Sequence, residues 1–176
     1  KTVFNHGFLT FNGQKISKSL GNTISPIILV KKYGTDTVRY FCLRNFPFGE
    51  DGDFSEESLQ ERYNNELANK LGNLVSRVST LAEKYGIKKS TPINSKPVLV
   101  KTKKHLKNYE IDKALNEIFA FIDQLNKYIQ QKKPWETQDK KVLYQLANGI
   151  KDIAILLSSF MPETSEKIAK TFNFEI

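Results

Sequence analysis

The sequence has few residues of the kinds that build covalent or metal cross-links. Only one of its 176 residues is cysteine and two are histidine. The single cysteine, Cys42, excludes an internal disulfide and a cysteine-rich zinc site. No apolar run approaches the ~20 residues that cross a bilayer, and no secretory signal pattern is present. We therefore expect a cytoplasmic protein that has no zinc or other metal site and no membrane contact.

Acidic residues are missing from one long segment. Lysine and arginine number 27 against 19 aspartates and glutamates, a formal net charge of +8. Between Lys84 and Lys107 there are eight lysines and no acidic residue, so this segment accounts for the whole excess. It is compatible with an electrostatic footprint for an RNA backbone, and also with a solvated connector between basic helix ends. The sequence leaves both interpretations open.

The most informative stretch near the start is a short lysine-rich loop. Phe8–Phe11 is β-prone, and the Asn12-Gly13 pair after it is typical of a type I′ hairpin turn. Lys15-Ile16-Ser17-Lys18-Ser19 follows, and then Leu20-Gly21-Asn22. Two ammonium groups three residues apart, with hydroxyls beside them, suit a polyphosphate. A surface turn without a ligand has the same composition.

Helical patterns dominate the rest of the chain, so the fold class is predicted to be mainly α. A first helix is expected from Pro26 to a stop at Gly34, and a second from Thr35 to just before Pro47. An amphipathic pattern then predicts a long helix from Ser55 to about Tyr85. Further helices are expected at about 111–132 and 137–160, with a short last one from Pro162. The segment 91–97 is expected to be a connector.

Two features of these helices are candidate recognition groups. Asn69, Asn73 and Arg77 are spaced i, i+4, i+8, which predicts a polar ladder along the long helix. Amides and a guanidinium can read a base edge, or can form an ordinary solvated flank. Trp135, the only tryptophan, follows Pro134 at a helix end. An indole there can stack on an unpaired base or pack on the bundle.

Two other features admit a chemical interpretation but favour a structural one. His6 could act as a base, although no partner is near it in the sequence. Asp51-Gly52-Asp53 has carboxylates that could bind a metal, but the segment lacks the further spaced carboxylates of a calcium loop. We therefore expect a turn at Asp51–Asp53.

Several runs, in order, resemble class I aminoacyl-tRNA synthetases and most closely the methionyl-tRNA synthetases. The lysine loop resembles the family's K-M-S-K-S motif, with Ile16 where methionine is commoner. The other similar runs are Tyr33–Arg39 (Y-G-x-D-x-x-R), Phe48–Ser55 (F-G-x-D-G-D-F-S), Leu67–Arg77 and Phe160–Thr164 (F-M-P-E-T). The resemblance covers the whole chain. It divides the chain into residues 1–55, the end of the catalytic domain with a stem-contact segment, and residues 56–176, a helical anticodon-binding domain.

The resemblance also implies an activity and its residues. The family joins methionine to its tRNA through a methionyl-adenylate made from ATP with Mg²⁺. By this similarity residues 15–19 would bind ATP, Lys18 would stabilise the leaving pyrophosphate, and Lys15 would support it. Asn69, Asn73, Arg77 and Trp135 would contact the CAU anticodon of the methionine and initiator tRNAs.

The sequence lacks other parts of this family. The H-I-G-H motif, the methionine pocket, the nucleotide-binding sheet and the zinc-binding insertion precede this region in its members. The first residue is Lys1. We therefore expect a piece of a longer chain that cannot form the adenylate alone. A split RNA-binding module acting in trans is an alternative. A synthetase for another aliphatic amino acid or cysteine is a further one, against which the ladder and Pro134-Trp135 argue.

Overall fold

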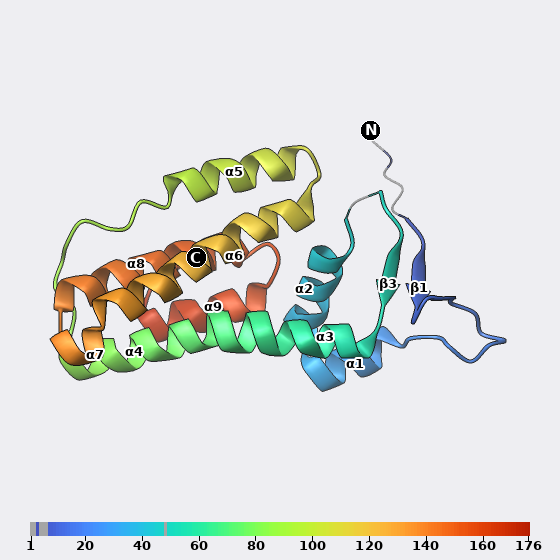
Figure 1. The fold of residues 1–176 in the computed structure, drawn as a ribbon, viewed down its shortest axis with the longest axis horizontal. Helices are drawn as coiled ribbons and strands as arrows, with labels where there is room; N and C mark the ends of the chain where they lie inside the picture. The colour runs from blue at the N-terminus through green and yellow to red at the C-terminus, as the bar shows by residue number, and fades with distance from the viewer. Residues whose placement is uncertain (1–2, 4–6, 48) are drawn as a thin grey trace.

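The computed structural model describes residues 3, 7–47 and 49–176. Figure 1 shows a bundle of long helices on one side and a small sheet with a protruding loop on the other. The mainly helical fold predicted from the sequence is confirmed. His6 and Phe48 lie outside the described residues, so the hypothesis that His6 is a base is not addressed.

The small sheet has the strand order β2-β1-β3. Strands β1 (Leu9–Phe11) and β2 (Gln14–Lys15) are antiparallel, with Thr10 opposite Lys15. The turn residues Asn12 and Gly13 have φ values of 51° and 73°, as a type I′ turn requires. Strand β3 (Gly52–Phe54) pairs with β1 in parallel. The predicted hairpin is therefore present, but the segment expected to be only a turn contributes a strand.

Two short helices follow the lysine loop and pack against the sheet. Helix α1 (Pro26–Tyr33) ends at Gly34, whose φ of 84° is a conformation that glycine adopts without strain. Helix α2 (Thr35–Asn45) begins at once. Leu29, Phe41, Phe54 and Leu59 form a small apolar cluster between these elements and the next helix.

One continuous helical segment runs from residue 56 to residue 85 and joins the two sides of the molecule (Figure 1). It consists of α3 (Glu56–Arg62), a π-helical stretch η1 (Tyr63–Gly72) and α4 (Asn73–Tyr85). Ser55 caps its start, because its hydroxyl accepts from the backbone N–H of Ser58 at 3.1 Å. The predicted limits are correct, but the ten-residue π-helical stretch has no signal in the apolar pattern.

The helices that follow complete the bundle around a large apolar core. They are α5 (Lys96–Lys107), α6 (Ile111–Lys132), α7 (Pro134–Thr137), α8 (Lys140–Leu157) and α9 (Pro162–Phe172). The core joins η1, α4, α6, α8 and α9 and includes Leu74, Ile118, Leu146 and Ile153, all fully buried. In the part of the chain described, no helix is both long and apolar enough to span a bilayer.

The sequence-based description was wrong at two places in the bundle. Residues 96–107 form helix α5, whereas no helix was predicted there. Its inner face consists of Val98, Thr102 and His105, at a spacing that fits a helix but with only one apolar member. The third long helix begins at Lys140 rather than near Thr137, because Pro134–Thr137 forms the separate turn α7.

Candidate functional site

The lysine loop leaves strand β2 and is closed by an asparagine. The side chain of Asn22 accepts from the N–H of Ser17 at 2.8 Å and donates to the carbonyl of Lys15 at 3.0 Å. The hydroxyls of Ser17 and Ser19 lie 2.8 Å apart. Gly21, with a φ of 66°, lets the chain turn back. The loop is thus held at its base while its tip projects from the molecule at the right of Figure 1.

The charged groups of this loop are open to solvent. Lys15, Lys18 and Ser19 are exposed, and Ile16 and Ser17 are half-buried. Neither lysine is in an ion pair with any carboxylate of the described residues. Two unpaired ammonium groups on a closed loop can approach an anionic ligand without first breaking a salt bridge.

The acidic segment after α2 supports the hairpin. Asp53 accepts hydrogen bonds from the hydroxyl of Thr10 at 2.6 Å and the N–H of Gly13 at 2.8 Å, and these bonds lower the pKa of its carboxyl. Asp51 accepts from the N–H of Phe8 at 2.7 Å. Both carboxylates therefore stabilise the hairpin that precedes the lysine loop by accepting hydrogen bonds from it. Among the described residues no three His, Cys, Asp or Glu side chains gather as a metal site would require.

The polar ladder lies on the long helix as its spacing predicts. Asn69 belongs to η1, Asn73 is the first residue of α4, and Arg77 lies one turn further on. Both asparagines are exposed, and their amides make no hydrogen bond with the rest of the described chain. Free amides can still pair with a base edge, since their donors and acceptors are not used internally.

Arg77 and Trp135 are brought together from different helices. Trp135 lies in the single turn α7, between Lys133 and Gln138, which both have left-handed backbone conformations. The guanidinium of Arg77 lies 5.1 Å from the centre of the indole ring. Such cation–π contacts contribute ~0.5–2 kcal/mol. A cavity of about 290 Å³ adjoins the pair. Trp135 is half-buried and packs against the core, so the indole has both a packed side and an accessible one.

Helix α7 and the lysine loop lie at opposite ends of the molecule, at the left and at the right of Figure 1, and the ladder lies on the long helix between them. A half-buried ionic cluster links α2 to this helix. Glu66 of η1 accepts from the hydroxyl of Tyr40 and forms ion pairs with Arg44 at 3.4 Å and Arg62 at 3.1 Å. Burial alone would raise the pKa of Glu66, but these partners outweigh it and lower the pKa below the usual value.

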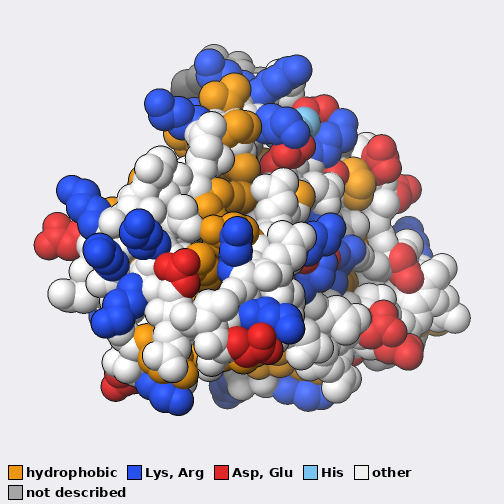
Figure 2. Space-filling view, turned by 60° about the vertical axis from the view of Figure 1, so that its left-hand side comes forward, with side chains coloured by type: hydrophobic (Ala, Val, Ile, Leu, Met, Phe, Trp, Pro, Cys, Tyr) orange, Lys and Arg blue, Asp and Glu red, His pale blue; other side chains and the backbone are white. Residues whose placement is uncertain are grey.

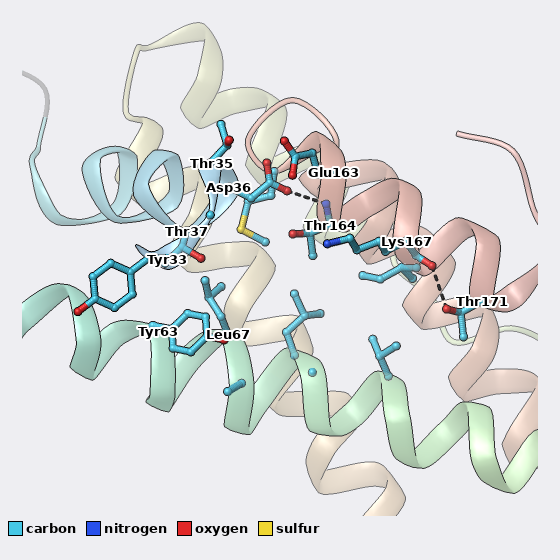
Figure 3. Close-up of a pocket in the computed structure, with 17 residues that line it drawn as sticks. Tyr33, Thr35, Asp36, Thr37, Tyr63, Leu67, Glu163, Thr164, Lys167 and Thr171 are labelled. Carbon is cyan, nitrogen blue, oxygen red and sulfur yellow. Dashed lines mark hydrogen bonds between the residues drawn. The ribbon is translucent and has the colours of Figure 1, made fainter. Parts of the chain in front are cut away.

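A second link joins α2 to the turn between α8 and α9. Asp36, only 7% exposed, accepts from the N–H of Thr164 at 2.6 Å (Figure 3). Arg39 donates to the carbonyls of Ser159 and Phe160, both at 3.0 Å. We call these three hydrogen bonds the α2–α9 clasp. A cavity of about 420 Å³ lies beside it, between α2, η1 and α9. The clasp connects the segment after the lysine loop directly to the bundle.

The lysine-rich segment forms an exposed surface over α5. The inner face of this helix packs on α6 while its five lysines, Lys96, Lys101, Lys103, Lys104 and Lys107, are all exposed. Only Lys101 has a carboxylate partner in the described part of the chain, Glu117 at 3.1 Å. Figure 2 shows lysine and arginine side chains gathered at the top of the molecule, where α5 lies in Figure 1. Residues 86–95 of the segment are thus a connector without helix or strand, and the part from Lys96 on is a basic helix face.

Comparison with known proteins gives two successive family matches, separated by residues 80–95. Residues 1–79 match the family described as tRNA synthetases class I (M), and residues 96–175 match the anticodon-binding domain of tRNA ligases. Over its whole length the chain is 40% identical to the methionine–tRNA ligase of Clostridium tetani. The chain belongs to the methionyl-tRNA synthetase family. It spans 31% of the length of that relative, and 31% of the Thermotoga maritima methionine–tRNA ligase, to which it is also 40% identical over 99% of the chain.

Solved structures of this family share the fold. Mycobacterium tuberculosis methionyl-tRNA synthetase in complex with methionyl-adenylate superimposes with a TM-score of 0.83 at 31% sequence identity. The match covers 93% of this chain and 36% of that one. Most of the arrangement of sheet, long helix and bundle is thus shared with that synthetase.

Several residues that hold the family's motifs in place were not identified from the sequence. Asn22 closes the lysine loop, and the α2–α9 clasp joins the Tyr33–Arg39 run to the Phe160–Thr164 run. The sequence does contain a signal for Asn22, since this residue ends the Leu20-Gly21-Asn22 run that follows the lysine motif in the sequence. The sequence contains no signal for the clasp, because the residues that it joins are more than 100 positions apart.

Proposed function

We propose that this chain is the part of a methionine–tRNA ligase that reads the tRNA anticodon and supplies the ATP-binding lysine loop. Residues 56–176 would bind the CAU anticodon, and residues 1–55 would connect it to the catalytic core. The observation that carries the proposal is the pair formed by Arg77 and Trp135 beside the free amides of Asn69 and Asn73. An aromatic face and unpaired amides on one surface are what an unstacked base requires.

The lysine loop would act on ATP within the complete enzyme. Lys18 would stabilise the charge that develops on the leaving pyrophosphate, and Lys15 would support it. Their exposed, unpaired ammonium groups and the hinge-like closure by Asn22 suit a loop that moves over a polyphosphate. Mg²⁺ accompanies ATP in this chemistry as part of the substrate complex. The printed sequence contains no H-I-G-H motif, so we expect the 176 residues alone not to form methionyl-adenylate.

The proposed partners follow from the same assignment. They are methionine tRNAs, ATP, and methionine bound by the rest of the synthetase. The Mycobacterium tuberculosis relative was solved with methionyl-adenylate, which supports the same intermediate here. We propose the cytoplasm as the compartment, in keeping with the single cysteine.

The test is binding of the chain to an RNA stem-loop that carries the CAU anticodon, measured by fluorescence anisotropy at fixed salt. A stem-loop with a changed first anticodon base is the control ligand. We expect clear preference for CAU, and we expect Trp135→Ala to lower the affinity for the CAU stem-loop by about tenfold or more, since base stacking contributes ~1–3 kcal/mol. Equal, strongly salt-dependent binding of both RNAs would contradict the assignment.

A further inference from the structure

A small cavity lies between α4 and the single turn α7, where the ladder ends. It has a volume of about 290 Å³ and is lined by Ser76, Arg77, Thr80, Leu81 and Trp135. Drug-sized ligands occupy cavities of ~300–1,000 Å³, so this space suits one small ring system rather than a larger ligand. None of the five lining residues is acidic. A phosphate-bearing ligand therefore meets no like charge in the wall of the cavity.

The cavity wall has stacking groups and hydroxyl groups. The guanidinium of Arg77 lies 5.1 Å from the centre of the Trp135 ring, and both groups are planar, so a base can stack on either of them. Ser76 and Thr80 are exposed. They are four residues apart, which places them on one face of α4, about 6 Å apart along its axis. Asn73 is three residues before Ser76 on the same face, so its exposed amide is followed along α4 by two hydroxyls that line the cavity.

Neither hydroxyl is used inside the described part of the chain. Serine and threonine in a helix can donate to a carbonyl three or four residues earlier, and Ser79 does so to the carbonyl of Ser76 at 3.0 Å. The side chains of Ser76 and Thr80 make no hydrogen bond with the described residues. Each hydroxyl therefore keeps one donor and two acceptor positions for a ligand.

We infer that Ser76 and Thr80 are further binding residues of the anticodon site, and that their hydroxyls form hydrogen bonds with the edge of the base that stacks on Trp135. The inference rests on the proposed function, because that function brings a base to Trp135. A base that stacks inside this cavity has its edge next to the cavity wall. Besides the guanidinium of Arg77, the polar side-chain groups of that wall are the two hydroxyls and the indole N–H. Because a hydroxyl both donates and accepts, the two residues contribute to affinity more than to the choice of base.

Three single substitutions in α4 form a matched set. Ser76→Ala and Thr80→Val remove the two cavity hydroxyls, and valine keeps the shape of threonine. Ser79→Ala removes a hydroxyl of the same helix that is used internally. We expect each of the first two to weaken binding of the CAU stem-loop by about threefold to tenfold, as the loss of one hydrogen bond implies. Ser79→Ala should bind as the wild type does, and thermal unfolding shows whether each variant is folded.

Stem-loops that lack one anticodon base locate the contact. Three such RNAs are compared, each with an abasic nucleotide at one of the three anticodon positions. The base that stacks on Trp135 is the one whose removal abolishes the effect of Trp135→Ala, since a pairwise interaction vanishes when either partner is absent. We expect the effects of Ser76→Ala and Thr80→Val to be lost with that same RNA and to persist with the other two.

Two results would overturn the inference. If folded Ser76→Ala and Thr80→Val proteins bind CAU as the wild type does, while Trp135→Ala weakens binding, the two hydroxyls belong to a solvated flank. If their effects persist with all three abasic RNAs, or are lost with a different one from Trp135→Ala, the hydroxyls do not contact the stacked base. Failure of the proposed function is seen separately, because the wild-type chain then binds CAU and base-changed stem-loops equally.

Discussion

The α2–α9 clasp can be broken by the single change Asp36→Ala. The carboxylate reaches across from α2 and accepts from the N–H of Thr164, the third residue of α9. That N–H has no partner within its own helix. Asp36 therefore caps the N-terminus of α9, although it lies on another helix rather than just before α9 in the sequence. Its negative charge also lies at the positive end of the helix dipole.

The size of the effect follows from these two contributions. Loss of a capping side chain costs ~0.5–2 kcal/mol, and a carboxylate at a helix N-terminus contributes ~0.3–1 kcal/mol or more when partly buried. The second oxygen of Asp36 is buried and makes no hydrogen bond with the described residues, which offsets part of the gain. We expect Asp36→Ala to lower the free energy of unfolding by ~1–3 kcal/mol. For a chain of this length this corresponds to a Tm about 3–10 °C lower.

Thermal unfolding followed by circular dichroism measures this change. Thr35→Ala, at the exposed neighbouring position, is the matched control and should stay within about 0.5 kcal/mol of the wild type. Asp36→Asn keeps a carbonyl acceptor for Thr164 and should lose about 1 kcal/mol or less. A wild-type Tm for Asp36→Ala would refute the capping argument. If Asp36→Asn lowered the free energy of unfolding as much as Asp36→Ala does, the negative charge of Asp36, and not its hydrogen bond to Thr164, would account for the stabilisation.

Three further predictions concern the ionic cluster, the lysine loop and the basic helix. The pKa of Glu66 is lowered in the folded chain. The contribution of this carboxylate to the free energy of unfolding is therefore present above its unfolded pKa of ~4.3 and is lost as the pH falls through the folded pKa. Glu66→Gln should make the decline of Tm between pH 5 and pH 3 less steep. Asn22→Ala removes both bonds that close the lysine loop and should speed trypsin cleavage after its lysines, without changing Tm. Replacing Lys96, Lys103 and Lys107 by glutamine should reduce the salt slope of stem-loop binding by ~0.7–0.9 per lysine that contacts phosphate; an unchanged slope would leave α5 as a solvated face.

The elements that the sequence predicted well are those whose causes are local. Asn12-Gly13 determines the hairpin because both residues adopt positive φ. Ser55 and Gly86 mark the ends of the long helix by capping and by a φ of 78°. The ladder spacing and the position of Trp135 after a proline are likewise read directly from the sequence. These signals are short-range and need no knowledge of what lies across the bundle.

The features that escaped prediction depend on residues distant in sequence. Helix α5 packs on α6 through Val98 and the polar residues Thr102 and His105, so it has no apolar stripe to detect. The stretch η1 accepts a hydrogen bond from Asn126 of α6 at the carbonyl of Lys70. The contact of Arg77 with Trp135 joins positions 58 residues apart. Motif similarity indicated which residues matter, but the contacts that orient them arise only when the helices pack.

If the lysine loop and Trp135 act on the same tRNA-charging reaction, the distance between them has to be fixed by the protein. Three features of the structure do this. The long helix is continuous and contributes Leu59 to the small apolar cluster and Leu74 to the large one. The Glu66 cluster and the α2–α9 clasp tie α2 to that helix and to the end of the bundle. Since all three meet at α2, which follows α1 and the loop, a shift of the bundle would be transmitted to α2 first. Within the Tyr33–Arg39 run, Asp36 and Arg39 are therefore the residues through which the lysine-loop side of the molecule is connected to the bundle.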